Sequence, residues 1–536
     1  MKSFFVFLLL VPSIGYSIQY SYPLNDDIDI QHYTFLLELN DSTNVIAGKA
    51  TLTALFKKQV SVFRLDLATQ DHTGTGMHVS SVLLNGESLS FHHQQDGLLI
   101  TLNAPVSVNE KLSVEIHYQG IPRDGLIIGK NKYNDRTFFG DNWPNRAHQW
   151  LPTIDHPSDK AGVDFIVIAP PHYEVIANGI RLEESVLNSK QKLTHWREVA
   201  DIPTKVMVIG AARFAIQRVG LVNNIEVESW VYPQNRLEGF YDYAIATKVL
   251  DFFNSHVGPY AYKKLANVQS KTRYGGMENA SNIFYYENSV TGKGVIENLV
   301  AHEVAHQWFG NSASEKDWHH VWLSEGFATY FTHLYNEFIY GRDKRAAAMA
   351  EDRTSVIKFF RESPQPVVFT ELPPDLMKIL NDNSYQKGAW VLHMLRQMTG
   401  DQHFWAGIRE YYRQYQNSNA STADFQSVME EVSGKDLDQF FKQWLYNAGH
   451  PVLEASWTYD SKAKKVSITF VQTQKNQLFD FPLEIGITVP NQTLPRMETV
   501  HLNKESQKFS FSVDTRPTRI DLDPFTNLLF EGRMKN

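Results

Sequence analysis

The chain has 536 residues, of which 43% are hydrophobic and 13% aromatic, so it is long enough to form several packed domains. Its formal net charge is −8 and it contains no block of basic residues, which argues against nucleic acid as a partner. Cysteine is absent, so disulfides are excluded and any metal site has to use nitrogen and oxygen ligands.

The first twenty residues, MKSFFVFLLLVPSIGYSIQY, have the pattern of a secretory signal peptide. Lys2 supplies a positive charge, the run Phe4–Val11 is apolar, and small residues follow Pro12. We therefore predict a signal peptide over residues 1–17, cut near Ser17, and export to the periplasm or the medium. Because the apolar run is short and interrupted, no stable membrane span is expected, and an uncleaved anchor is the alternative.

Apolar and polar residues alternate through much of residues 18–216, as expected of β-strands. Turn residues separate the alternating segments, which include HYTFLLELN (32–40), GKATLTALF (48–56), VSVFRLDL (60–67), KLSVEIHY (111–118) and FIVIAPP (165–171). This part is predicted to be an all-β N-terminal domain.

Residues 217–449 begin with a short β segment at 225–233, and helical patterns dominate the rest of this range. Beyond AGHP (448–451) the alternation returns in VLEASWTYD, KVSITFVQT, LEIGITVP, KFSFSVD and RIDLDP. We therefore predict a helical middle domain and a small β-sandwich over residues 450–536.

The segment AHEVAHQWFG (301–310) carries the first chemical signal. The apolar spacing over 295–309 predicts a buried helix, on which His302 and His306 lie one turn apart on the same face and Glu303 flanks them. Two imidazoles beside a carboxylate suit a zinc ion and a group that accepts a proton from water. The motif is short enough to arise by chance, in which case both histidines would be hydrogen-bonded core residues.

A third ligand is predicted in VWLSEGFATYF (321–331), a second buried helical pattern. The break at 310–316 lets this helix fold back beside the first. A carboxylate on an apolar face needs a partner, which zinc supplies to Glu325, and three protein ligands leave a fourth position for water. The sequence thus predicts one Zn²⁺ per chain, bound by His302, His306 and Glu325. The alternative for Glu325 is an exposed position at a helix start.

The segment YGGMEN (274–279) follows a strand-like run at 265–270. Two glycines allow a backbone to approach another chain closely, and an exposed strand edge can bind an extended peptide. There the carboxylate of Glu278 would hold the α-ammonium group of a peptide. Taken alone, this segment would be a plain turn.

Together, GGMEN, HEVAH and WLSEG, with their spacing, resemble the zinc aminopeptidases of the aminopeptidase N type. These gluzincins include the leukotriene-epoxide hydrolase/aminopeptidases. The resemblance runs from about Ser21 to the C-terminus. It implies a multidomain α+β fold with a saddle-like N-terminal β domain, a thermolysin-like and mostly helical catalytic domain, and a C-terminal β-sandwich. Many relatives carry a further C-terminal helical domain; this sequence stops before it, so a short form is expected.

The resemblance also implies a role for each matched residue. His302, His306 and Glu325 match the zinc ligands, and Glu303 matches the general base. Glu278 matches the acid that anchors the substrate amine. The neighbouring residues of the same motif are predicted to line the bound peptide: Gly275, Gly276, Met277 and Asn279.

Two further positions come from the resemblance. SYQKGAWVLHML (384–395) resembles the family's tyrosine motif, so Tyr385 is predicted to stabilise the tetrahedral intermediate as a neutral phenol donor. A second amine-binding residue is expected within FFGDNWPNRAHQWLPTIDHP (138–157), which is two residues longer than usual between Arg146 and Pro152. Counting back from Arg146 gives Asp141, which we assign. Counting back from Pro152 gives Trp143, which cannot bind an ammonium group by charge.

The predicted function is that of an exported zinc aminopeptidase acting on peptides with a free N-terminal amine, by zinc-activated water attack on the first peptide bond. One alternative is an epoxide hydrolase with aminopeptidase side activity, but the positions expected to hold an acid and a second tyrosine hold Met377 and Leu380. Another is a non-catalytic peptide-binding protein. An endopeptidase is disfavoured because Glu278 would block internal bonds. Neither the oligomeric state nor the preferred N-terminal residue follows from the sequence.

Overall fold

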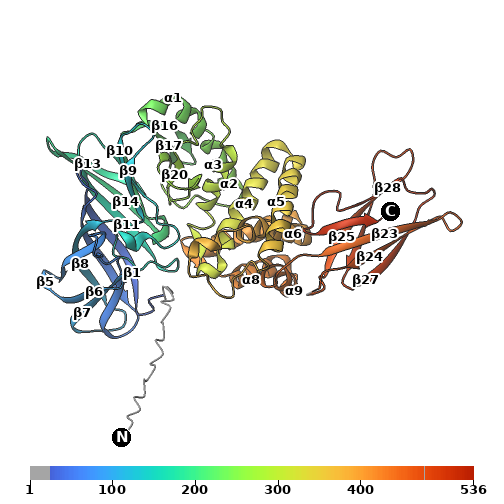
Figure 1. The fold of residues 1–536 in the computed structure, drawn as a ribbon, viewed down its shortest axis with the longest axis horizontal. Helices are drawn as coiled ribbons and strands as arrows, with labels where there is room; N and C mark the ends of the chain where they lie inside the picture. Colours follow the sequence, from blue (N-terminus) through green and yellow to red (C-terminus); the bar gives the residue numbers. More distant parts are fainter. Residues whose placement is uncertain (1–23, 476, 536) are drawn as a thin grey trace, which may run out of the picture.

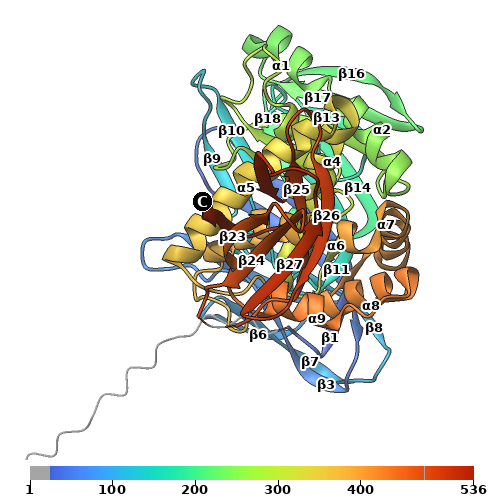
Figure 2. The same ribbon diagram turned by 90° about the vertical axis from the view of Figure 1, so that its right-hand side faces the viewer.

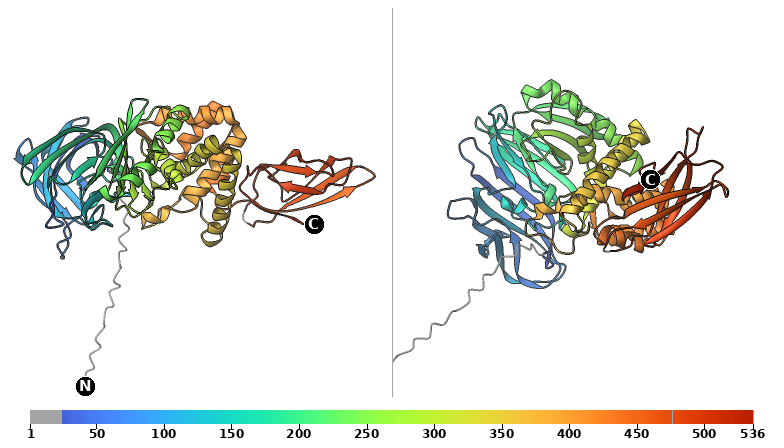
Figure 3. Two further views of the ribbon diagram at one scale, coloured as in Figure 1. Left: turned by 90° about the horizontal axis from the view of Figure 1, so that it is seen from above. Right: turned by 45° about the vertical axis from the view of Figure 1, so that its right-hand side comes forward.

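A computed structural model describes residues 24–475 and 477–535, in which three parts follow one another along the chain (Figure 1). An N-terminal β domain lies at one end, a helical region in the middle and a β-sandwich at the other end, and the view from above shows them in a row (Figure 3). The predicted fold class is confirmed. The predicted signal peptide, residues 1–17, lies outside the described residues.

The N-terminal domain is built on an eight-stranded sheet. Its strands lie in the order β13 (Ile180–Asn188), β14 (Gln191–Pro203), β11 (Lys160–Ala169), β1 (Ile28–Glu38), β2 (Ile46–Phe56), β8 (Lys111–Ile121), β4 (Gly76–Leu84) and β5 (Glu87–Ser88). In β1 the pairing with β2 shifts between Ile30 and His32, so the buried positions change from Ile28 and Ile30 to Tyr33 and Phe35. This bulge explains why strict alternation fails at the start of the strand.

Two smaller sheets complete this domain. One has the order β3 (Val60–Asp66), β7 (Gly97–Val106) and β6 (Ser90–Gln94). The other has the order β12 (Glu174–Ala177), β15 (Ile209–Ala212), β10 (Arg136–Gly140) and β9 (Leu126–Lys130). The loop after β10 carries Asp141 and Trp143 toward the middle part of the molecule, where Trp143 packs against Trp318.

The middle part begins with a five-stranded sheet. Its order is β16 (Ala215–Val222), β17 (Ile225–Val231), β18 (Lys264–Ser270), β20 (Asn282–Tyr286) and β19 (Gly276–Met277). Strands β17, β18 and β20 are parallel, and β19 runs antiparallel to β20 at the edge. The GGMEN segment therefore supplies an edge strand, and within residues 24–475 and 477–535 its outer side pairs with no other strand.

Helices form the rest of the middle part. They are α1 (Arg236–Tyr243), α2 (Ala246–His256), α3 (Glu297–His306), α4 (Trp322–Tyr340), α5 (Arg342–Glu362), α6 (Gly388–Thr399), α7 (Asp401–Tyr415), α8 (Thr422–Ser433) and α9 (Asp438–Phe441). Helix α4 is buried over most of its length because α3, α5 and α6 all pack against it. A short parallel pair, β21 (Ala313–Glu315) and β22 (Ser418–Ala420), joins the α3–α4 connection to the α7–α8 connection. Among the residues described, no helix has both the length and the apolar character needed to cross a membrane.

The C-terminal part is a β-sandwich (Figure 2). One sheet has the order β27 (Ser506–Ser512), β24 (Lys465–Gln472), β23 (Val452–Asp460) and β29 (Glu531–Lys535), and the other has the order β26 (Arg496–Leu502), β25 (Phe481–Thr488) and β28 (Arg519–Leu522). Alternate residues of the central strands are buried, as the sequence pattern predicts. The sandwich is tied to the helices by Arg353 of α5, whose Nη2 donates to Asp523 Oδ2 over 2.5 Å.

Candidate metal centre and active site

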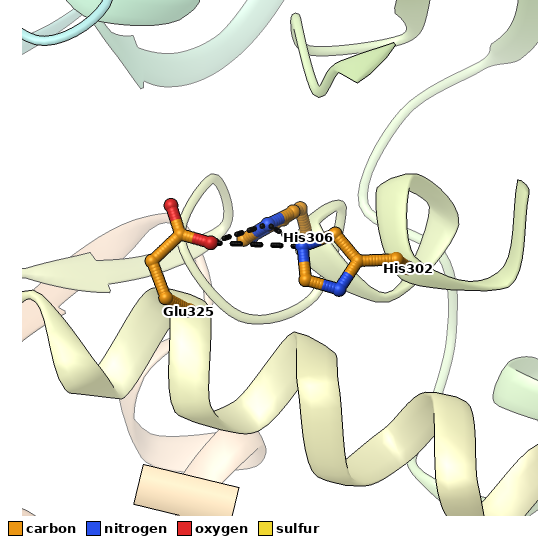
Figure 4. Close-up of side chains that lie close together, drawn as sticks. All are labelled: His302, His306 and Glu325. Atoms are coloured by element: carbon orange, nitrogen blue, oxygen red, sulfur yellow. Dashed lines mark hydrogen bonds and ion pairs between the residues drawn. The ribbon is translucent and has the colours of Figure 1, made fainter. Parts of the chain in front are cut away.

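The two histidines of α3 and Glu325 of α4 point toward one another (Figure 4). The Nε2 atoms of His302 and His306 are 3.1 Å apart. Glu325 Oε2 lies 3.6 Å from Nε2 of His302 and 3.3 Å from Nε2 of His306. The helical period brings the histidines together, and the packing of α3 on α4 adds the carboxylate.

These three residues fit a zinc ion. Tetrahedral ligands at zinc–ligand distances near 2.0–2.1 Å lie about 3.3 Å from one another, which matches the three separations. His306 Nδ1 lies 3.1 Å from the carbonyl oxygen of Phe309, so its N–H donates there and leaves Nε2 free as a ligand. Glu325 Oε2 is buried without a satisfactory hydrogen bond among the described residues, and a bound cation would stabilise it.

Groups of opposite charge lie close together around this centre, and they shift one another's pKa values. Burial lowers the pKa of His302, which favours the neutral imidazole that binds metals. Burial acts in the same direction on His306, but the carboxylates of Glu325 and Glu278 outweigh it and raise the pKa of His306 to about 10. Against the effect of burial, the adjacent histidines hold the pKa of the Glu325 carboxyl well below its usual range. Metal binding at His306 is therefore coupled to the loss of a proton.

Glu303, the predicted general base, lies beside the histidines and close to strand β19. A Cβ atom on Gly276 would lie only 2.2 Å from Glu303 Oε1, so the close approach of strand and carboxylate requires a glycine at this position. Burial raises the pKa of Glu303 well above its usual range, and the charges of Glu278 and Glu325 add to this. An acid with a raised pKa is suited to accept and return a proton near neutral pH.

Glu278, the predicted amine anchor, directly follows β19 and is buried. Its side-chain Oε1 has no hydrogen-bond partner among the described residues, so it can accept hydrogen bonds from a cationic ligand. Its backbone carbonyl accepts hydrogen bonds from Gln307 Nε2 at 2.7 Å and from Asn311 Nδ2 at 2.6 Å. These two amides attach the end of the edge strand to the segment that follows α3.

Tyr385 lies in a π-helical turn, Asn383–Lys387, that leads into α6. Its ring is stacked on His302, with ring centroids 6.0 Å apart and an interplanar angle of 12°. Burial, and then the charges of Glu325 and Glu278, raise the pKa of Tyr385 well above its ordinary value. The phenol therefore stays protonated and is available as a hydrogen-bond donor.

A cavity of about 90 Å³ joins these groups. Besides the metal-binding triad, its lining consists of Trp143, Tyr274, Gly276, Met277, Glu278, Glu303, Leu380 and Tyr385. Of the other predicted peptide-lining residues, Gly275 and Asn279 are not part of the lining. A larger cavity of about 600 Å³ lies between α6, α9 and the sandwich and contains none of the predicted site residues.

The structure separates the two candidates for a second amine-binding residue. Asp141 is fully buried, with its Oδ1 accepting a hydrogen bond from Arg146 Nη2 at 2.5 Å, and it does not line the cavity. Trp143 does line it. The Asp141 carboxylate is thus paired with an arginine, and an indole stands where the cavity meets the N-terminal domain.

Several positioning residues were not predicted from the sequence. Gln307 and Asn311 follow the HEVAH motif, but their role as amide donors to Glu278 depends on how the strand packs. Gly326 and Gly388 allow α4 and α6 to approach so closely that a Cβ on Gly326 would lie 2.8 Å from Gly388 Cα. This contact brings Tyr385 beside the metal-binding triad. Both glycines stand within a few residues of predicted site residues. That position in the sequence could have indicated a close contact between two elements at the site.

Comparison with known proteins agrees with this geometry. Residues 241–444 match the Peptidase family M1 domain, and residues 30–206 match the Peptidase M1 N-terminal domain. The chain belongs to peptidase family M1. The resemblance inferred from the motifs is therefore confirmed.

Curated relatives of this M1 chain carry aminopeptidase names. "Probable aminopeptidase 2" of Sulfurisphaera tokodaii is 26% identical over 84% of this chain and 58% of its own length. "Leucyl aminopeptidase" of Saccharolobus solfataricus is 24% identical over 84% of this chain and 58% of its own. "Aminopeptidase A" of Gloydius brevicauda is 28% identical over 66% of this chain and 37% of its own. The chain thus spans less than two thirds of the length of these relatives.

We predict that the purified protein binds about one zinc ion per chain and that His306→Gln loses it on dialysis, because two ligands hold zinc much more weakly than three. Metal content is measured by mass spectrometry of the dialysed protein. His319→Gln is the matched control, since His319 lies outside the metal-binding group. Full zinc occupancy in His306→Gln would contradict the assignment.

Proposed function

We propose that the protein is a zinc-dependent aminopeptidase that removes single residues from the N-terminus of peptides. The observation that carries the proposal is the convergence, in one small cavity, of the metal-binding triad, the Glu303 carboxylate and the unpartnered carboxylate oxygen of Glu278. The metal-binding triad and Glu303 suit peptide-bond hydrolysis. Glu278 would restrict that reaction to the N-terminal end of a peptide, where the free amine carries a positive charge. Membership of peptidase family M1 supports the same conclusion.

In the proposed mechanism His302, His306 and Glu325 hold the zinc ion. When bound, zinc supplies a Lewis acid that polarises a carbonyl group and lowers the pKa of a water molecule. The Glu303 carboxylate takes a proton from the attacking water and then gives it to the leaving amine. The Tyr385 hydroxyl donates a hydrogen bond to the carbonyl oxygen as negative charge develops on it.

Selection for the N-terminal residue would come from Glu278. The peptide is expected to extend beside the edge strand β19, whose outer side carries no strand partner among the described residues. With its ammonium group bound to Glu278, the peptide presents its first carbonyl to Glu303 and the metal site. An internal segment has no ammonium group, so it would leave the Glu278 carboxylate buried without a partner.

The epoxide hydrolase alternative finds less support. The resemblance places an acid and a second tyrosine of that subgroup at Met377 and Leu380. Leu380 lines the cavity with an apolar side chain, and the Met377 sulfur lies 3.8 Å from the Tyr274 hydroxyl. Neither supplies the carboxylate or the phenol that such a reaction would use.

The first test compares leucine p-nitroanilide with its N-acetylated form, with and without a zinc chelator. We expect chelator-sensitive cleavage of the free amine and about a hundredfold slower cleavage of the acetylated substrate, since acetylation removes the charge that Glu278 binds. Equal cleavage of both substrates would overturn the role of Glu278. Cleavage of neither by the zinc-loaded protein would overturn the proposed function and favour the epoxide hydrolase or the binding protein.

A second prediction concerns Tyr385. We expect Tyr385→Phe to lower kcat by about 10²–10³ with little change in KM or zinc content, because it removes one donor to the developing oxyanion. Steady-state kinetics on leucine p-nitroanilide measure this. Tyr335→Phe is the matched control, since that hydroxyl donates to Glu297 and lies outside the cavity. If the two variants lose activity equally, Tyr385 has no specific role.

We also propose that residues 1–17 direct export and are removed, on the strength of the signal-peptide pattern in the sequence. The expected result is that the protein recovered from the periplasm or medium of an expressing bacterium begins near residue 18. Mass spectrometry of the intact protein measures this. Recovery of full-length chain from the membrane fraction would favour an uncleaved anchor instead.

A further inference from the structure

The N-terminal domain contributes a single side chain to the catalytic cavity, namely Trp143, as far as the described residues go. The loop that carries it is held firmly by its neighbour Asn142. The Asn142 amide donates to the carbonyl oxygens of Thr204 at 3.1 Å and Met207 at 2.6 Å, and its oxygen accepts from Trp150 Nε1 at 2.8 Å. These contacts fix the loop backbone next to Trp143, so the orientation of the indole itself depends on what packs against its ring.

The indole packs against the catalytic domain through a second tryptophan. The rings of Trp143 and Trp318 have centroids 5.2 Å apart and an interplanar angle of 65°. Trp318 opens a short helical turn, Trp318–His320, just before α4. The two rings thus form a contact between the domains directly beside the cavity.

A buried ion pair lies against both rings. Lys205 is 1% exposed and Glu315 is fully buried, and Lys205 Nζ lies 2.5 Å from Glu315 Oε1. The same ammonium group lies 6.0 Å from the ring centroid of Trp143 and 5.5 Å from that of Trp318. Lys205 comes from the N-terminal domain and Glu315 from β21, so this pair also bridges the two domains.

This arrangement is costly for a purely structural contact. Removing two charges from water is seldom repaid in stability, and apolar residues of the same volume would often serve as well. A buried pair does specify geometry, because the ammonium group attracts the faces of aromatic rings from a fixed point. Here the Lys205 ammonium group faces the rings of Trp318 and of Trp143, and Trp143 lines the cavity.

The lining of the cavity divides into a polar and an apolar part. The metal-binding triad, Glu278, Glu303 and Tyr385 supply the polar groups that the proposed reaction uses. What remains is Gly276 and the largely apolar side chains of Trp143, Tyr274, Met277 and Leu380. With its ammonium group and carbonyl held by the polar groups, a substrate has to direct its first side chain toward this apolar part.

We propose that Trp143 is a specificity-determining wall of the site, selecting substrates whose first side chain is apolar, and that Lys205 and Glu315 are positioning residues that hold its ring. The proposal rests on the proposed function, since it assumes that Glu278 binds the substrate amine. In this scheme Glu278 binds the substrate amine, and Trp143 contacts the first side chain of the substrate.

The test of the wall compares the kcat/KM values of leucine and alanine p-nitroanilides, because the alanine side chain is too short to make the same contact. We expect Trp143→Ala to lower the leucine-to-alanine ratio by about tenfold, the scale set by losing a few apolar contacts in a pocket. Trp143→Phe keeps an aromatic ring and is expected to retain the ratio within about threefold. An unchanged ratio in Trp143→Ala would overturn the proposal.

The test of the ion pair uses the same ratio. Lys205→Met is expected to lower the leucine-to-alanine ratio, but by less than Trp143→Ala does. Lys205→Arg is expected to keep the wild-type ratio, because arginine keeps the charge. The double variant Lys205→Met with Glu315→Gln removes both charges and serves if the single variant does not fold. Lys192→Met is the matched control, since Lys192 pairs with Glu174 in the N-terminal domain and does not line the cavity. Equal ratios in Lys205→Met and Lys192→Met would overturn the positioning role.

Calorimetry with two amines separates this proposal from the proposed function. 3-Methylbutylamine and ethylamine carry the side chains of leucine and alanine but have no bond to cleave. Wild-type protein is expected to bind the larger amine more tightly, and Trp143→Ala is expected to lose that preference. If both results hold but no substrate is cleaved, the wall is supported and the peptidase function fails. No preference between the amines in the wild type would overturn the wall even if peptides are cleaved.

Discussion

The burial of several carboxylates around two histidines is the interaction on which the rest of this molecule depends. Glu278, Glu303 and Glu325 are all buried, and each lies within 4.8 Å of His306. Such a concentration of negative charge is unfavourable without cations, so it fits a metal site and, in the proposed function, the ammonium group of a substrate. Helices α3 and α4 and the edge strand β19 have to meet at this point for the charges to be compensated.

Small residues and amides make that meeting possible. Gly276 lets β19 lie against the Glu303 carboxylate, and Gly326 and Gly388 let α4 and α6 come into backbone contact. Gln307 and Asn311 then hold the end of the strand through the carbonyl of Glu278. A larger side chain at any of these glycines would prevent the close approach, and an apolar side chain at Gln307 or Asn311 would remove the hydrogen bond. Each contact joins residues that belong to, or follow, different helices or strands.

The N-terminal domain is joined to the site by a contact of a different kind. Trp143 and Lys205 come from that domain and Trp318 and Glu315 from the catalytic one, so the ring pair and the ion pair cross the same boundary. The proposed chemistry is thus assigned to the helical part. The wall that would meet the substrate side chain is assigned to the N-terminal domain. Under this proposal Trp143 contributes to side-chain selection from outside the domain that carries the reacting groups, so substitutions at this boundary are expected to change selection more than the reaction.

Much of the site could be predicted because its signals are local. The helical period places His302 and His306 on one face, and the motifs around Glu278 and Glu325 have spacings that the family resemblance makes specific. Strand alternation predicted both β domains, although not the bulge in β1. The sequence left open whether Asp141 or Trp143 reaches the site. The loop after β10 has no periodicity from which the direction of a side chain could be inferred. Only the packed structure decides that Asp141 pairs with Arg146 while Trp143 lines the cavity, and that Lys205 and Glu315 meet across a domain boundary, because contacts between residues distant in the chain depend on how whole domains pack.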